Sequence, residues 1–159
     1  TAILSAGGIM KEITSNLKMK DIYFSEIHFK YKKEKVGQFP LNINFKIDYK
    51  RDNKNKHLIT VIITTTIQDE INQLDLFVVC NGLFELNDSQ SLTEKEKQQL
   101  LKINTVAIMF PYIRSQISII TSQPGLSPIQ IPIIDVNKLL NDQKTSDIQN
   151  KSNETKGED

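Results

Sequence analysis

The chain has 159 residues and a formal net charge of +1, with 38% apolar and 25% charged residues. A chain of this length buries enough surface to form a hydrophobic core, and its composition is that of a globular protein. Only Arg51 and Arg114 are arginines among the 20 basic residues, which argues against a nucleic-acid binder that needs bidentate contacts to phosphates and guanine. The single cysteine, Cys80, cannot form an intramolecular disulfide, so we expect a cytoplasmic protein.

The sequence lacks the motifs of the common enzyme classes. The two histidines, His28 and His57, cannot supply a three-histidine metal site, and no GxGxxG, GxxxxGK(S/T) or GxSxG motif occurs. Carboxylates at 69–70, and Glu94 with Glu96, fall at an expected turn and an expected helix start, where acids usually cap or face solvent. We therefore expect no enzyme, cofactor or metal. The apolar runs are also too short for insertion into a membrane.

The first half of the chain predicts four strands. Residues 41–50 alternate between apolar and polar side chains, which is typical of an antiparallel strand with one buried face. Residues 57–67 are rich in Ile, Val and Thr, and residues 71–86 predict a strand that is interrupted near Asn81-Gly82. In residues 17–31 the apolar positions change parity twice, which predicts a long strand with bulges or a bend.

The pattern then changes to helices. Thr93 and Glu96 form a capping-box pattern that predicts a short helix. Because Pro111 would cost about 3 kcal/mol inside a helix but suits a first helical turn, we expect a separate second helix over about residues 110–122. Asp135 is placed to cap a last helix that contains leucines.

This order predicts an α+β fold, in which a four-stranded antiparallel sheet is followed by helices packed on one face. We expect a flexible leader over residues 1–16, one domain over 17–140 and a disordered polar tail over 141–159. Residues 1–56 carry 12 basic and 6 acidic side chains. This surplus either attracts an acidic partner or forms a solvated face.

The segment over residues 122–134 is apolar but interrupted by proline. Pro124, Pro128 and Pro132 lack the N–H group that a sheet ladder requires, so the segment is extended yet unable to pair fully with a sheet. Such a segment forms either a surface that binds other chains or a buried connection between helices.

Several short motifs occur together in this order. Met109–Arg114 reads MFPYIR, and an apolar helix and the proline-interrupted segment follow it. Earlier in the chain, residues 20–24 read KDIYF and Phe39-Pro40 precedes the second strand. Gly82–Phe84, near the end of the fourth strand, reads GLF. Together these motifs resemble those of SecB, the family of protein-export chaperones. The resemblance covers about residues 18–140 and agrees with the element order derived above.

The resemblance implies an ATP-independent holdase, a homotetramer built as a dimer of dimers. Such a protein binds unfolded precursor proteins in apolar grooves, keeps them competent for Sec-dependent export and passes them to the SecA translocase. By analogy, the client-binding residues are Phe39, Ile43, Leu126, Ile129, Ile131, Leu139 and Leu140. Asp21 and the nearby Glu26 would contact the translocase, and no cofactor or nucleic acid is implied.

The chain departs from the family pattern in its charge. SecB proteins are usually strongly acidic, whereas Ser25 and Phe77 stand here at two of the family's acidic positions and the first third of the chain is basic. This difference points to an alternative, a SecB-like chaperone dedicated to one client, such as the antitoxin of a toxin–antitoxin–chaperone system.

Overall fold

The computed structural model describes residues 17–87 and 93–144, and a four-stranded sheet is its main feature. The order of the strands across the sheet is β1-β4-β3-β2, and every neighbouring pair is antiparallel. β1 and β2 are therefore the two edge strands. The bounds of the strands are Leu17–Tyr31 for β1, Leu41–Arg51 for β2, Leu58–Asp69 for β3 and Leu74–Leu86 for β4.

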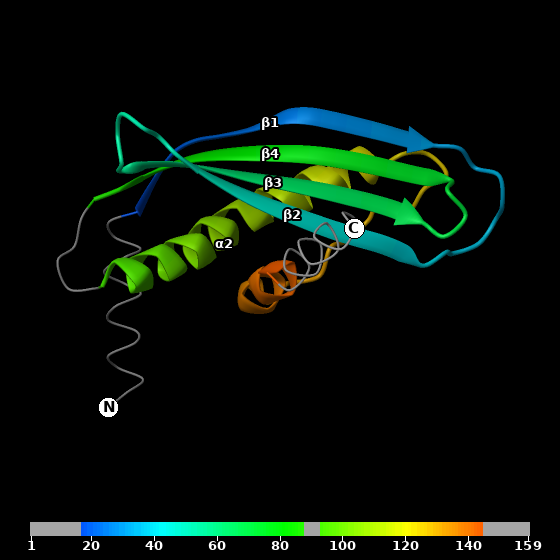
Figure 1. Cartoon of the computed structure of the whole chain (residues 1–159). Coiled ribbons are helices and arrows are strands. Elements are labelled where there is room, and N and C mark those ends of the chain that lie inside the picture. Colours follow the sequence, from blue (N-terminus) through cyan, green and yellow to red (C-terminus); the bar gives the residue numbers. More distant parts are fainter. Residues whose placement is uncertain (1–16, 88–92, 145–159) are drawn as a thin grey trace, which may run out of the picture.

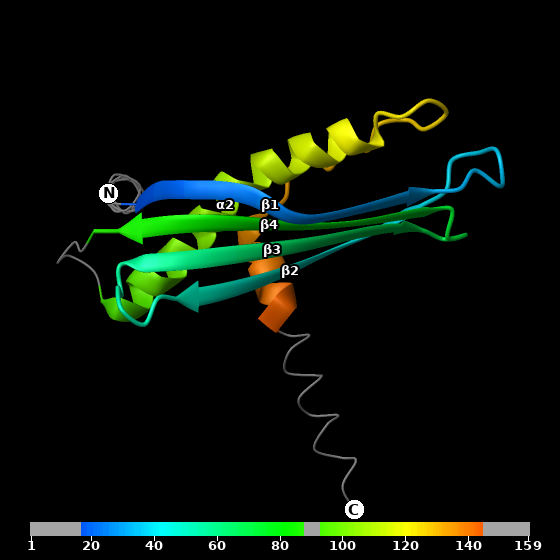
Figure 2. The same ribbon diagram turned by 90° about the horizontal axis from the view of Figure 1, so that it is seen from above.

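Two helices lie on the same face of this sheet. α2 (Glu94–Thr121) crosses the face diagonally, from the hairpin between β2 and β3 to beyond the β1 edge (Figure 1 and Figure 2). A second helix, over residues 136–144, lies beside it beneath β2 and β3. The arrangement confirms the predicted α+β fold. The fully buried side chains between sheet and helix include Ile63, Ile67, Leu76, Phe84, Met109, Ile113 and Ile117.

The two predicted bulges in β1 are present. The register of β1 against β4 shifts between Met19 and Asp21, and again between Phe24 and Glu26. The apolar side chains change parity at the same two points. Each bulge therefore returns the apolar residues of β1 to the face that packs on the helices.

The predicted interruption of the fourth strand is wrong, because β4 runs without a break through Asn81 and Gly82. A Cβ atom on Gly82 would lie only 2.8 Å from the Met109 sulfur and 2.7 Å from a ring carbon of Phe84. The glycine thus permits α2 to pack closely against the sheet and does not mark a turn. The neighbouring Asn81 side chain donates a hydrogen bond to the Ser25 hydroxyl of β1 at 2.7 Å.

The helix after β4 is one helix and not the predicted two. Its predicted capping box is confirmed, since Glu96 N–H donates to the Thr93 hydroxyl and Thr93 N–H donates to the Glu96 carboxylate. The helix continues through Pro111, whose ring is exposed, to Thr121. Burial of side chains on both sides of the proline offsets its cost, because a fully buried apolar side chain contributes about 1.5–3 kcal/mol. Phe110 and Ile113 are 5% and 0% exposed.

The last helix begins where the sequence predicts. The Asp135 carboxylate accepts hydrogen bonds from the N–H groups of Asn137 and Lys138, at 2.9 and 3.2 Å. The helix extends to residue 144, so residues 141–144 do not belong to the expected disordered tail. The expected leader over 1–16, and the tail from residue 145 onward, lie outside the described residues. Among the described residues, no helix combines the length and apolarity needed to cross a membrane.

Candidate client-binding grooves

A groove of about 460 Å³ lies between the start of β2 and the segment that follows α2. We call it the loop groove. Phe39 and Ile43 line it from the β2 side, and Leu126 and Ile129 line it from the segment after α2. Four of the seven predicted client-binding residues, from sites more than 80 positions apart in the sequence, therefore meet at one concave surface.

The segment after α2 is fixed by side chains of that helix. Thr121 is fully buried, and its hydroxyl accepts a hydrogen bond from the Ile129 N–H at 2.8 Å while donating to the Ile117 carbonyl. Arg114 Nε donates to the Ile131 carbonyl at 2.8 Å. These bonds satisfy main-chain groups that the prolines keep out of a sheet.

The opposite wall of the loop groove depends on a buried polar pair, Asp69 and Gln73. Gln73 is 4% exposed, and its Oε1 accepts hydrogen bonds from the N–H groups of Glu34 and Lys35 at 2.7 and 2.6 Å. The Asp69 carboxylate accepts a hydrogen bond from the Gln73 N–H at 2.7 Å. Sequence reasoning assigned Asp69 to a turn and missed Gln73, because their partners are not readable from local patterns.

The edge of β2 beside the loop groove presents main-chain groups. Ile47 donates its N–H to Gln143 Oε1 at 3.3 Å and accepts a bond from Gln143 Nε2 at 3.0 Å. The N–H and C=O of one residue in an antiparallel strand point to the same side, and alternate residues repeat it. Because the β2–β3 register is unbroken, the same groups of Ile43 and Phe45 also point away from β3. No described residue hydrogen-bonds to them.

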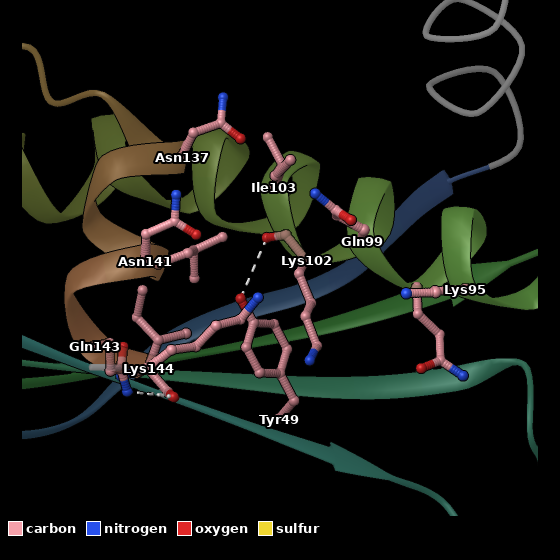
Figure 3. A pocket seen from close by; sticks show the side chains of 12 residues that line it. Tyr49, Lys95, Gln99, Lys102, Ile103, Asn137, Asn141, Gln143 and Lys144 are labelled. Carbon is pink, nitrogen blue, oxygen red and sulfur yellow. Dashed lines mark hydrogen bonds between the residues drawn. The ribbon is translucent and has the colours of Figure 1, made fainter. Parts of the chain in front are cut away.

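A second hollow, of about 330 Å³, lies at the other end of β2. We call it the lysine pocket (Figure 3). It is lined by Ile47, Tyr49, Lys95, Gln98, Gln99, Lys102, Ile103, Asn137, Leu140, Asn141, Gln143 and Lys144. The Tyr49 hydroxyl donates to the Lys102 carbonyl at 3.3 Å, and Lys102 Nζ lies 5.3 Å from the centre of the Tyr49 ring. Burial raises the pKa of the Tyr49 phenol, which therefore stays neutral at physiological pH.

The other three predicted client-binding residues lie outside the loop groove. Leu140 lines the lysine pocket, and Leu139 is half-buried against the core. Ile131 is 2% exposed and belongs to the core, as Ile129 does at 7% exposed. A client would contact Phe39, Ile43 and Leu126, which are half-buried, more readily than Ile131.

The two predicted translocase-contact residues lie on β1, away from both grooves. Asp21 and Glu26 pair with Leu83 and Val79 of β4 and face away from the helices. Both are exposed, and the Glu26 carboxylate lies 2.8 Å from His28 Nε2. Their proposed contact stays a prediction. Among the described residues, no group of three or more His, Cys, Asp or Glu side chains could hold a metal ion.

Comparisons with known proteins place this fold, a four-stranded sheet with two helices on one face, in a class of chaperones. The model of the family described as preprotein translocase subunit SecB matches residues 11–147. The chain therefore belongs to the SecB family, whose chaperones are not enzymes.

Individual relatives agree with this assignment. The chain is 27% identical to the protein-export protein SecB of Orientia tsutsugamushi (strain Boryong), over 84% of this chain and 87% of that one. It is 30% identical to an uncharacterised protein of Methanocaldococcus jannaschii, over 77% of each chain. The fold is similar to that of a SecB-like chaperone of Mycobacterium tuberculosis, solved in complex with a ChAD peptide from the HigA1 antitoxin. That match has a TM-score of 0.64 at 14% identity, and it covers 83% of this chain and 99% of the other.

Proposed function

We propose that this protein is an ATP-independent holdase that binds unfolded polypeptides in the cytoplasm and keeps precursors competent for Sec-dependent export. The observation that carries the proposal is the loop groove beside the open edge of β2. The groove offers apolar contacts from Phe39, Ile43 and Leu126, and the edge offers the main-chain groups of Ile43 and Phe45. An extended segment of any sequence has main-chain groups to pair with such an edge, and alternate apolar side chains to fill such a groove.

The proposed assembly is a homotetramer built as a dimer of dimers. An apolar surface on the outer side of the helix layer supports it. Tyr112 and Ile119 of α2 are 45% and 63% exposed. Tyr112 and Ile119 are seven residues apart and so lie on one side of the helix. Large apolar side chains gathered in this way are typical of surfaces that other chains cover.

The charge of the outer sheet face supports the second candidate, a chaperone dedicated to one client such as an antitoxin. At the positions where the family usually carries acids, the Ser25 hydroxyl accepts a bond from Asn81, and Phe77 packs with its ring centre 6.1 Å from that of His28. Asp21 and Glu26 remain as acids for a SecA contact. The similar fold solved with an antitoxin peptide gives the same candidate a precedent.

The test is suppression of aggregation without nucleotide. Citrate synthase denatured in guanidinium is diluted into buffer with increasing amounts of this protein, and light scattering is followed. We expect suppression near one oligomer per citrate synthase chain. A protein that suppresses nothing at any ratio would exclude the general holdase and leave the dedicated chaperone.

The groove is tested with the double variant Phe39→Ser/Leu126→Ser. The loss of two apolar contacts should weaken suppression at least about tenfold. The matched control, Tyr23→Ser/Leu83→Ser, removes an aromatic and a leucine from the outer sheet face and should suppress normally. Circular dichroism confirms that both variants fold. Normal suppression by the groove variant would show that clients bind elsewhere.

A further inference from the structure

We propose that the client segment bound along β2 is acidic beside its apolar part, and that lysines at both ends of this strand bind its carboxylates. The inference rests on the proposed function and names the chemistry of the client. Three observations support it: the cations of the lysine pocket, the two lysines that line the loop groove (Lys33 and Lys35), and the distance between the two hollows.

The lysine pocket gathers cations from two separate helices. Lys95 and Lys102 come from α2, and Lys144 comes from the helix over residues 136–144. Figure 3 shows Lys102 and Lys144 reaching toward Tyr49 from its two sides. The contact with the Tyr49 ring holds Lys102 over an apolar surface. Cations gathered in a hollow raise the local concentration of anionic groups more than the same charges spread over a surface.

No carboxylate lines this pocket within the described part of the chain. The acids nearest in sequence are engaged elsewhere: Asp48 lies 3.5 Å from Lys46, Glu94 3.2 Å from Lys97, and the Glu96 carboxylate accepts bonds from Thr93. Asp142, on the same helix as Lys144, is not among the residues that line the pocket. The positive charge of the pocket is therefore not cancelled by its own walls.

The loop groove at the other end of β2 has the same sign of charge. Lys33 and Lys35 line it, and its one carboxylate among the described residues is Asp69. Asp69 is 8% exposed and already accepts hydrogen bonds from the N–H groups of Gln73 and Leu74. A client in this groove thus meets apolar walls and exposed lysines.

The spacing fits one extended segment. Ile43 of the loop groove and Tyr49 of the lysine pocket are six residues apart on β2, which is about 20 Å at about 3.3 Å per residue. A client that pairs with Ile43 and Phe45, and then passes the Gln143 side chain at Ile47 without pairing there, therefore places residues about six positions away at the lysine pocket. The three lysines of the pocket favour Asp or Glu there, Lys33 and Lys35 favour acids at the loop groove, and both groups disfavour Lys or Arg.

Three synthetic peptides test the inference. Each has the same nine-residue apolar core with one Trp, and three Asp, three Asn or three Lys residues at each end. Because this protein contains no Trp, fluorescence anisotropy of the peptide Trp reports binding directly. We expect the Asp peptide to bind about tenfold more tightly than the Asn peptide, the Lys peptide to bind more weakly, and high salt to remove the difference.

Two matched triple variants locate the effect. Lys95→Gln/Lys102→Gln/Lys144→Gln should lower the preference for the Asp peptide over the Asn peptide to below about threefold. The control, Lys18→Gln/Lys46→Gln/Lys50→Gln, removes the same charge from the outer sheet face and should keep the preference. Equal binding of the three peptides would overturn the inference and leave the holdase function intact. Equal effects of the two variants would overturn the assignment to the lysine pocket. Failure of all three peptides to bind would instead contradict the proposed function.

Discussion

At the scale of single residues, the loop groove depends on buried polar side chains that replace main-chain pairing. Gln73 accepts two N–H groups of the loop before β2, and Thr121 accepts the N–H of Ile129 on the opposite wall. Each of these side chains fixes a segment that has no strand beside it. The shape of the groove therefore depends on a few hydrogen bonds. The loss of one of them should lower both the free energy of unfolding and the affinity for a client.

We predict that Gln73→Leu lowers the free energy of unfolding by about 1–3 kcal/mol, because two main-chain N–H groups lose their acceptor. Urea denaturation measures the change. Gln68→Leu is the control, since Gln68 is exposed and its side-chain amide donates to the Asp75 carboxylate at 3.3 Å. Its effect should stay within about 0.5 kcal/mol. Similar losses from the two variants would contradict this role for Gln73.

The lone cysteine shows a residue whose environment the sequence does predict. Cys80 stands in an apolar strand, and it is fully buried in the core. Burial raises the pKa of its thiol to about 11, so the thiol is protonated at neutral pH. A buried, protonated thiol is a poor nucleophile, which fits a packing role for this residue.

At the scale of elements, local patterns predicted all four strands but also a break in β4 that is absent, and they were insufficient for the long helix. The parity changes in residues 17–31 predict both bulges of β1, because a bulge moves apolar side chains from one face to the other. Pro111 misled the prediction, because its local cost is visible in the sequence whereas the packing that offsets it is not. Contacts at the candidate site are likewise not readable from local sequence patterns. Gln143 and Ile47 are 96 positions apart, and only the fold brings them together.

The continuous helix leads to a prediction about Pro111. Pro111→Ala should raise the free energy of unfolding by about 1–2 kcal/mol, because it restores a helix N–H donor and removes a ring that crowds the preceding turn. Urea denaturation of the variant measures this. The comparison is Ala107→Gly, one turn earlier on the exposed side, which should lower stability by about 1 kcal/mol. A loss of stability in Pro111→Ala would show that the proline makes a favourable contact of its own.

At the scale of the whole molecule, the outer side of the helix layer is the surface expected to hold subunits together. We predict that Tyr112→Asp/Ile119→Asp shifts the proposed tetramer to a smaller species, since charges placed on a covered apolar surface are costly to bury. Size-exclusion chromatography with light scattering measures the mass. Tyr23→Asp/Ile62→Asp on the outer sheet face is the control and should leave the mass unchanged. A wild-type monomer would contradict the proposed assembly.

The contact between Gln143 and Ile47 also bears on strand pairing between copies of this chain. An open strand edge that accepts unfolded segments would equally accept the β2 edge of another copy, and unlimited edge pairing produces fibres. The Gln143 amide occupies the main-chain groups of Ile47 as a neighbouring strand would, and so divides the edge into two short stretches. A short stretch is long enough for a flexible client to pair with, but it offers two rigid sheets too few bonds to join. The last helix thus limits the length over which another strand can pair with the β2 edge, which disfavours edge-to-edge pairing between copies of this chain.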